Sequence, residues 1–374
     1  MARRAALVLL LPALAGCFGS APVGPKPAAL AVLQQAREPR VLWSAAIGGA
    51  GAFVFQPALA NDSIYAASRS GAVVRLDASS GRQRWRIVLD ARLSGGVGAD
   101  ARTVVVASDA GEVYALEASD GALRWRARVS SEVLSAPRVD GELVLLRSAD
   151  SRIYALGVED GKRRWAYQRA PAPLMVRTPA GMTPREDTLF VGFAGGRLVA
   201  LALATGAVRW EAAVALPKGA TELERVTDVV GDPVAIGREV CAAAFQGRVA
   251  CFDAQNGNLQ WARDISSVTG ASADARNVYV SDDRGAVHAL DRSNGRSLWK
   301  QDRLSYRQLS LPLPLDAQIA VGDLQGYVHL LSRDTGAFVA RIATDGSAVR
   351  AAPLRLPGGF LVQTQSGGLF ALAP

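Results

Sequence analysis

The sequence predicts an all-β fold, namely an eight-bladed β-propeller of four-stranded antiparallel blades whose last blade is closed by the N-terminal strand. Two observations predict it. A unit with fixed internal spacing recurs along the chain, with ten residues between two turn positions and four more to a Trp. The first and last copies are incomplete, and each supplies what the other lacks. The Trp positions recur about every 43 residues, which favours four-stranded blades over shorter helical repeats.

Six complete copies share a turn residue, an apolar strand, a second turn with Gly and then Trp. They begin at Gly71, Gly111, Ser151, Gly196, Gly247 and Gly285, and they reach Trp85, Trp125, Trp165, Trp210, Trp261 and Trp299. A seventh copy has Ala340 in the Trp position, and an eighth starts at Gly367 and stops at the chain end. Trp43 has no such hairpin before it, so we expect its strand to complete the eighth blade. A ring closed in this way removes the exposed edges that an open sheet would offer.

The turns and strands of the unit fit tight antiparallel hairpins. Pairs such as Asp120-Gly121 and Asn256-Gly257 supply the positive backbone angles that short hairpin turns require. Strands such as residues 113–116 are apolar on both faces, as a blade packed between two neighbours needs. We expect the Trp that follows each turn to lie on the outer strand and to dock on the next blade.

The N-terminus is typical of an exported lipoprotein. Two Arg precede an apolar run that is too short to span a bilayer. The run ends in Leu14-Ala15-Gly16-Cys17, which resembles the lipobox of bacterial lipoproteins, whose Cys becomes lipidated. By the same resemblance, Phe18 in place of Asp favours the outer membrane. We expect a signal peptide over residues 1–16, a lipidated Cys17 with a Pro- and Ala-rich tether over residues 17–37, and a propeller over residues 38–374 on the periplasmic face.

Composition and residue usage exclude several classes of function. With 49% hydrophobic and 20% charged residues, the chain has enough apolar side chains for a large core. The net charge of +8 is spread along the chain without a basic run, so no nucleic-acid binding is expected. His288 and His329 both follow a repeat Gly by three residues and are expected to be packing residues. No catalytic residue, metal site or cofactor is predicted, because neither a phosphate-binding loop nor a Cys-His pairing is present.

Two cysteines, Cys241 and Cys251, flank one hairpin turn and are expected to face each other across it. Export would allow a disulfide. However, other copies place ordinary core residues at these positions, such as Tyr65 for Cys241 and Ala115 for Cys251. The sequence therefore leaves two interpretations open, a disulfide or two small core residues.

Two stretches of the chain are longer than the repeat allows. In most copies with a Pro before the hairpin, 14 residues separate that Pro from the repeat Gly, but Pro179 precedes Gly196 by 17. Between Trp210 and Pro233, about ten residues are inserted. The affected stretches, residues 171–186 and 215–230, fall at the same stage of adjacent repeats. We therefore expect them to project together on one face as a binding site.

The side chains of these two stretches favour a protein partner. The candidate contact residues are Leu174, Val176 and Arg177 in the first stretch and Glu222, Arg225 and Asp228 in the second. Arg among aliphatic neighbours is typical of the centre of protein interfaces. In the alternative interpretation, Leu174 and Val176 belong to a buried inner strand and the acidic stretch is only a solvated loop.

The repeat resembles the tryptophan-docking motif of quinoprotein-type, pyrroloquinoline-quinone-like propellers over essentially all of residues 38–374. Quinoprotein dehydrogenases also carry an adjacent Cys pair, a Ca²⁺-binding set and insertions that cover the quinone. This chain has no Cys-Cys pair and no such insertions. A quinoprotein dehydrogenase is therefore kept as an alternative only, together with a generic periplasmic ligand-binding propeller.

The lipobox, the eight repeats and the two long stretches together resemble the BamB family, lipoproteins of the outer-membrane β-barrel assembly machinery. In that family, an L-x-L-R segment and an acidic loop of the form T-E-I-D-R-L-S-D-V-D bind the POTRA domains of BamA. The first pattern matches Leu174, Val176 and Arg177, with Val for the second Leu, and the second matches residues 221–228. Val230 replaces the last Asp of the family pattern, which removes one polar group. The resemblance implies a scaffold without catalytic activity that binds BamA and assists outer-membrane protein assembly and insertion, with nascent outer-membrane proteins as a further candidate partner.

Overall fold

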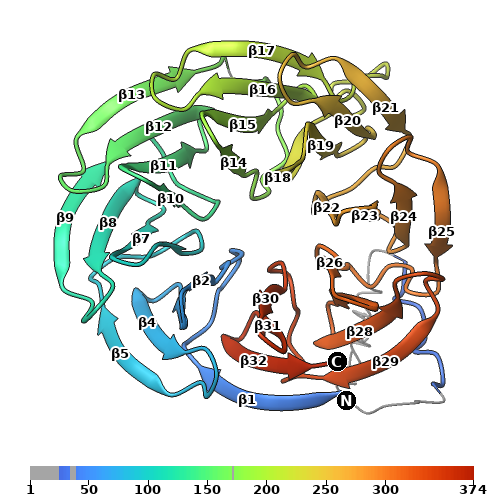
Figure 1. The fold of residues 1–374 in the computed structure, drawn as a ribbon, viewed down its shortest axis with the longest axis horizontal. Helices are drawn as coiled ribbons and strands as arrows, with labels where there is room; N and C mark the ends of the chain where they lie inside the picture. The colour runs from blue at the N-terminus through green and yellow to red at the C-terminus, as the bar shows by residue number, and fades with distance from the viewer. Residues whose placement is uncertain (1–24, 34–38, 171) are drawn as a thin grey trace, which may run out of the picture.

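The computed structural model describes residues 25–33, 39–170 and 172–374. In this part of the chain, 32 β-strands and no helix form eight four-stranded sheets, arranged as blades around a common centre (Figure 1). Neighbouring strands within each sheet are antiparallel. The expected eight-bladed all-β propeller is confirmed. Over the same residues, no helical segment is long and apolar enough to cross a bilayer.

Blades 1 to 7 each contain four consecutive strands, ordered from the centre outward (Figure 1). Blades 1 to 4 consist of β2 (Ala58–Ala60), β3 (Ser63–Ala67), β4 (Ala72–Asp77) and β5 (Gln83–Val88); β6 (Gly98–Ala99), β7 (Thr103–Ala107), β8 (Glu112–Glu117) and β9 (Leu123–Arg128); β10 (Arg138–Asp140), β11 (Leu143–Ser148), β12 (Arg152–Gly157) and β13 (Arg163–Gln168); and β14 (Met182–Arg185), β15 (Thr188–Phe193), β16 (Arg197–Ala202) and β17 (Val208–Ala213).

Blades 5 to 7 continue the same order. They consist of β18 (Val229–Ile236), β19 (Glu239–Ala244), β20 (Val249–Asp253) and β21 (Leu259–Arg263); β22 (Ala271–Ala273), β23 (Asn277–Ser281), β24 (Val287–Asp291) and β25 (Ser297–Gln301); and β26 (Leu313–Pro314), β27 (Gln318–Gly322), β28 (Tyr327–Ser332) and β29 (Phe338–Ala343). The second strands are buried almost throughout, whereas the outermost strands alternate between buried and exposed residues. This is the burial expected of sheets packed face to face with an outer rim in solvent.

Blade 8 is built from both ends of the chain. It contains β30 (Leu354–Leu356), β31 (Gly359–Gln363), β32 (Gly368–Ala373) and, as its outer strand, β1 (Arg40–Ala46). Trp43 lies opposite Ala371 in this pairing. The N-terminal strand therefore closes the ring, as the incomplete first and last repeats predict.

A bulge at the Trp position recurs in every blade. In blade 2, Ala115 lies opposite Trp125, but the next pair is Leu116 with Leu123, so the outer strand has one extra residue. The other seven blades show the same shift of register. Because a bulge bends the strand and redirects a side chain, it turns the Trp toward the neighbouring blade.

Each Trp contacts the blade that follows it. Its indole N–H donates a hydrogen bond to a backbone carbonyl of that blade, as from Trp125 to Val158 at 2.8 Å. The ring lies over the turn Gly of the same blade. At Gly161, φ is +65° and an added Cβ would come within 2.5 Å of the Trp125 ring. Glycine is thus required there both for the turn and for the close approach of the Trp.

The junction between blades 7 and 8 has no Trp. Ala340 occupies the position, opposite Leu330, and is buried. Elsewhere the Trp docks on the turn between the third and outer strands of the next blade. In blade 8 these two strands, β32 and β1, come from opposite ends of the chain, so no hairpin turn joins them. A Trp at position 340 would therefore lack the turn Gly on which its ring packs and the carbonyl that accepts its hydrogen bond.

Blade 5 contains a disulfide between Cys241 and Cys251. The two cysteines lie directly opposite each other on β19 and β20, and both are buried. Other blades have a bulky residue facing Ala at this place, as in the pair Phe190 and Ala200. The disulfide therefore replaces a packing pair without changing the strand register.

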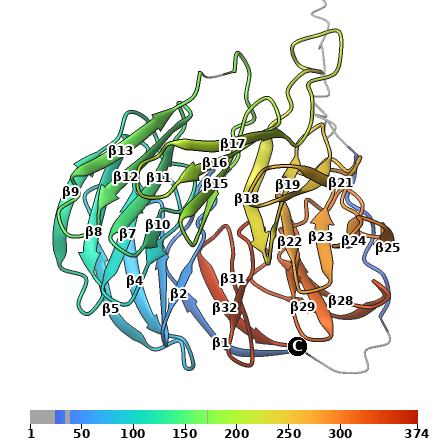
Figure 2. The same ribbon diagram turned by 45° about the horizontal axis from the view of Figure 1, so that its top comes forward.

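The expected signal peptide, residues 1–16, and the expected lipidated Cys17 lie outside the described residues. Residues 25–33, which we term the strap, run along the outside of blades 6 and 7 (Figures 1 and 2). The strap is hydrogen-bonded to the propeller, with the Ala28 N–H donating to the Ser305 carbonyl at 2.9 Å. This differs from the expectation of a free tether over residues 17–37, because this part of it is held to the folded body.

Candidate protein-binding site

The two long stretches form neighbouring loops on one face of the ring. Loop A (residues 172–181) leads from β13 to β14, and loop B (residues 214–228) leads from β17 to β18. Both connect the outer strand of one blade to the inner strand of the next, so both lie on the same face. Figure 2 shows them rising above that face. Neither Leu174 nor Val176 belongs to a strand, which contradicts the alternative of a buried inner strand.

Asp228 joins the two loops from a buried position. Only 6% of this residue is exposed. Its carboxylate accepts hydrogen bonds from the backbone N–H of Val176 in loop A at 2.6 Å and from that of Gly195 at 3.3 Å. Burial raises the pKa of Asp228, although these two donors and the charge of Arg147 act in the opposite direction. Asp228 therefore holds loop A in place and has little surface left for a partner.

Arg177 of loop A reaches residues of two other connections, Phe53 between β1 and β2 and Glu132 between β9 and β10. It forms a two-point ion pair with Glu132, with nitrogen to oxygen distances of 2.6 and 3.2 Å. Its guanidinium carbon also lies 5.3 Å from the centre of the Phe53 ring. More than half of the Arg177 side chain, 57%, remains exposed. The ion pair fixes the direction of the side chain and leaves one face of it open.

Large apolar side chains are exposed on both loops. In loop A these are Leu174 and Met175, at 45% and 39%, and in loop B they are Leu216 and Leu223, at 56% and 72%. Exposed apolar residues gathered on neighbouring loops are typical of surfaces that bind another protein. Val176 is only partly exposed, since its backbone is tied to Asp228.

The tip of loop B is a turn that stabilises itself. The carboxylate of Glu224 accepts hydrogen bonds from the backbone N–H groups of Ala220 and Thr221 at 2.8 and 3.1 Å, and the Thr221 hydroxyl accepts one from the Glu224 N–H. These backbone donors lower the pKa of Glu224. Glu222 and Arg225 pair with each other at 3.5 Å and are both largely exposed. The reciprocal bonds form a capping box, so the acidic stretch is an ordered turn with two charges on its surface.

A cavity of about 250 Å³ lies beneath loop A. Its walls include Arg147, Met175, Val176 and Asp228. Arg147 donates to the Gly192 carbonyl, and its guanidinium carbon lies 5.1 Å from the centre of the Phe193 ring. Burial lowers the pKa of Arg147 to about 10, against the opposing effect of Asp228, so it remains charged at neutral pH. A fixed positive charge below the loop stabilises the buried carboxylate of Asp228.

Three members of this site are not among the residues chosen from the sequence, namely Phe53, Glu132 and Arg147. A signal for Arg147 exists in the repeat, because equivalent positions in other blades hold small or uncharged residues such as Ala67, Ala107 and Ser281. Phe53 and Glu132 lie in connections of ordinary length and carry no such signal.

Both histidines of the propeller are paired with a carboxylate. His288 hydrogen-bonds to Asp282 at 2.8 Å and His329 to Asp323 at 2.9 Å. Both side chains are largely buried, as packing residues are, and each is also paired with a carboxylate, which the sequence pattern does not predict. Among the described residues, no group of three or more His, Cys, Asp or Glu could hold a metal ion.

Comparisons with known proteins agree with the fold and the repeats. The family model described as outer membrane protein assembly factor BamB matches residues 30–95 and 89–301. The curated protein of that name from Pseudomonas aeruginosa is 44% identical over 372 residues, covering 99% of this chain and 98% of its own length. The one from Bordetella pertussis is 42% identical over 370 residues, covering 98% and 96%.

Solved structures show the same architecture. The crystal structure of BamB from Moraxella catarrhalis has a TM-score of 0.83 and 28% sequence identity, and the match covers 90% of this chain and all of that one. A quinohemoprotein alcohol dehydrogenase from Comamonas testosteroni has a TM-score of 0.70 at 15% identity, with 76% of its chain covered. The second likeness is one of fold alone.

Proposed function

Because the chain belongs to the BamB family of outer membrane protein assembly factors, we propose that it is a scaffold that binds another protein of the assembly machinery through loops A and B. The observation that carries this proposal is the buried clamp between the loops. Asp228 fixes the backbone of loop A at Val176, directly beside the exposed Leu174, Met175 and Arg177. A preorganised loop binds with a smaller loss of conformational entropy.

The proposed partner is the POTRA region of BamA, with nascent outer-membrane proteins as further candidates. A partner suited to this surface presents an apolar patch for Leu174, Met175 and Leu223, and an acidic group for the open face of Arg177. The protein acts without catalysis or a cofactor, and the lipid on Cys17 holds it at the periplasmic face of the outer membrane. The partner, the lack of catalysis and the lipid anchor go beyond the family assignment and are part of the proposal.

The six candidate contact residues have different roles in this proposal. Leu174 and Arg177 contact the partner, and Glu222 with Arg225 offers two charges at the edge of the surface. Val176 contributes through its backbone N–H, and Asp228 is a positioning residue that acts through loop A. Loss of Asp228 would therefore weaken binding without removing any atom that touches the partner.

The decisive experiment is capture of a purified BamA POTRA fragment by the propeller. Arg177→Glu reverses the exposed charge and also places a carboxylate beside Glu132, so we expect capture to fall at least about tenfold. Arg92→Glu is the matched control, because Arg92 is exposed on the same face in the connection between blades 1 and 2. This control should bind like the unmodified protein.

A second pair of variants separates contact from positioning. Glu132→Gln removes the ion-pair partner of Arg177 but leaves the positive charge, so binding should persist within a few-fold. Asp228→Ala should weaken capture and raise hydrogen exchange at the Val176 amide. If Arg177→Glu captures the fragment as well as Arg92→Glu does, loops A and B are not the binding surface and the proposal fails.

A further inference from the structure

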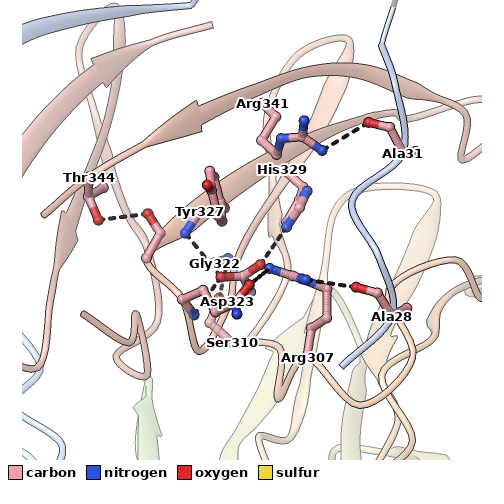
Figure 3. Close-up of polar contacts among 12 residues, drawn as sticks. Ala28, Ala31, Arg307, Ser310, Gly322, Asp323, Tyr327, His329, Arg341 and Thr344 are labelled. Carbon is pink, nitrogen blue, oxygen red and sulfur yellow. Dashed lines mark hydrogen bonds and ion pairs between the residues drawn. The ribbon is translucent and has the colours of Figure 1, made fainter. Parts of the chain in front are cut away.

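The strap is held by side chains of blade 7 and its preceding connection (Figure 3). Arg307 donates from Nη1 to the Ala28 carbonyl at 2.8 Å, and Arg341 donates from Nη1 to the Ala31 carbonyl at 3.1 Å. The Ala28 N–H in turn donates to the Ser305 carbonyl. Three backbone groups of the strap are thus bound to the propeller, and none of these contacts depends on a strap side chain.

The main binding site for the strap is a buried cluster of charged side chains. Arg307 is only 2% exposed, and Asp323 and His329 are fully buried. Arg307 donates from Nε to Asp323 and from Nη2 to the Gln325 side-chain oxygen, both at 2.6 Å. His329 hydrogen-bonds to the same carboxylate oxygen of Asp323. All three nitrogen atoms of the guanidinium therefore donate hydrogen bonds, and Nη1 is the one that donates to the strap.

Blade 6 provides an internal comparison. It has the same Asp and His at the same spacing, Asp282 and His288, but the position equivalent to Arg307 is Ser266. The Ser266 hydroxyl accepts a hydrogen bond from the backbone N–H of Gln246, and among the described residues it makes no hydrogen bond to the strap. A buried Arg is costly unless it is fully paired. The Arg is present in the cluster that hydrogen-bonds to the strap and absent from the matching cluster of blade 6, which links it to strap binding.

We propose that the Arg307, Asp323 and His329 cluster is a seat for the strap, and that the seat holds Ala28 on the face of loops A and B. Arg307 lies between β25 and β26, a connection from outer to inner strand like the two loops, and therefore on their face. The upper part of the strap lies on that side in Figure 2. Ala28 follows Cys17 by only 11 positions.

This seat limits the distance between the loop face and the membrane. Eleven extended residues reach at most about 40 Å. If Cys17 carries lipid, as proposed above, the seat lies within that distance of the bilayer, and the loop face is turned toward it. The opposite face, which carries turns such as residues 100–102, is turned away. A free tether that began at residue 38 would impose no such orientation.

The seat is tested by hydrogen exchange on the full chain. The reporter is the Ala28 amide, because this N–H of the strap donates to the Ser305 carbonyl of the propeller. We expect it to exchange at least about tenfold more slowly than in a free peptide of the same sequence. Arg341→Gln removes the hydrogen bond to the Ala31 carbonyl and should reduce this protection. Ala29→Pro should retain it, because Ala29 is exposed and its N–H has no partner in the described residues.

Arg102→Gln, on the opposite face, is the control for Arg341→Gln and should leave the protection of the Ala28 amide unchanged. Exchange of this amide at the free-peptide rate in the unmodified protein, or equal protection in Arg341→Gln and Arg102→Gln, overturns the seat. Neither result bears on capture of BamA, so this test and that of loops A and B fail independently.

The orientation is tested with the lipidated protein on vesicles that carry an acceptor dye at the surface. A donor dye at Lys218→Cys, on loop B, should transfer more energy than one at Arg102→Cys. Ala28→Pro, which removes the N–H that donates to Ser305, should reduce the difference. Equal transfer from the two positions, with the Ala28 amide of the parent chain protected, overturns the orientation. Recovery of the protein in the soluble fraction overturns it as well, because the lipid anchor is then absent.

Discussion

Seven of the eight blade junctions are built in one way, and the junction between blades 7 and 8 is built in another. At the seven, a Trp donates to a carbonyl of the next blade and covers its turn Gly. At the eighth, Ala340 lies in the Trp position and the next blade has no turn between its third and outer strands. The difference teaches that the Trp and the turn form one unit. A Trp is present at the junctions where the next blade has a hairpin turn between its third and outer strands, and it is absent where that turn is missing.

The largest effect is expected from removing a Trp at a regular junction. Trp125→Ala deletes a buried ring and its hydrogen bond to Val158, so the free energy of unfolding should fall by about 3–5 kcal/mol. Chemical denaturation of the purified protein measures this change. Leu123→Ala, on the exposed side of the same strand, is the control and should change it by less than about 0.5 kcal/mol. Equal losses in both variants would contradict a special role for the Trp.

A smaller effect is expected from adding a Trp at the irregular junction. Ala340→Trp introduces a bulky ring at a buried position that lacks both the turn Gly and the carbonyl acceptor. Overpacking of this kind should lower the free energy of unfolding by about 1–3 kcal/mol. The same denaturation experiment decides the matter, and a stabilised Ala340→Trp protein would show that the junction can accept the ring after all.

The smallest effect concerns the pH dependence of the blade that carries Ala340. Burial lowers the pKa of His329, and Arg307 and Arg341 act in the same direction, while the hydrogen bond and charge of Asp323 oppose them. The folded protein therefore keeps His329 neutral where the unfolded chain takes up a proton, and stability is lost as pH falls below about 6.5. His329→Phe should reduce the loss of unfolding free energy between pH 7 and pH 5 by on the order of 1 kcal/mol.

Thermal melting at both pH values measures this difference. Burial raises the pKa of Asp323, but the hydrogen bonds from His329 and Arg307 outweigh burial and lower it overall, so Asp323 stabilises the fold while it is ionised. Its stabilising contribution is therefore lost only as pH falls through that lowered value. An identical decline for His329→Phe and the unmodified protein between pH 7 and pH 5 would show that His329 titrates normally in the fold.

The number of blades, the ring closure and the position of loops A and B could be predicted from the sequence. They depend on spacing that repeats along the chain, so any departure from it, such as the insertion before Pro233, is visible in one dimension. The same spacing marks the Trp positions and their turn Gly. Local turn chemistry and strand pattern agree with it throughout, as in Asp120-Gly121.

The contacts that join distant segments could not be predicted in this way. The sequence pattern predicts that Asp228 is an exposed charge in an acidic stretch. It is instead buried and hydrogen-bonded to the backbone N–H of Val176, 52 residues earlier in the chain. Ala28 and Arg307 are separated by 279 residues. Neither pairing follows the repeat. Both depend on how the loops and the strap pack against the propeller. The sequence pattern therefore predicts the framework better than the surfaces built on it.

Closure of the ring by β1 has a mechanical consequence for any force applied to the N-terminus. Tension on the chain before residue 25 is transmitted along the strap to Arg40, the first residue of the strand that pairs with β32. The hydrogen bonds at Ala28 and Ala31 lie earlier on this path and must break first. The strap would act as a sacrificial link that lengthens under load and rebinds when the load ends, and it would protect the outer strand of blade 8 from being peeled away.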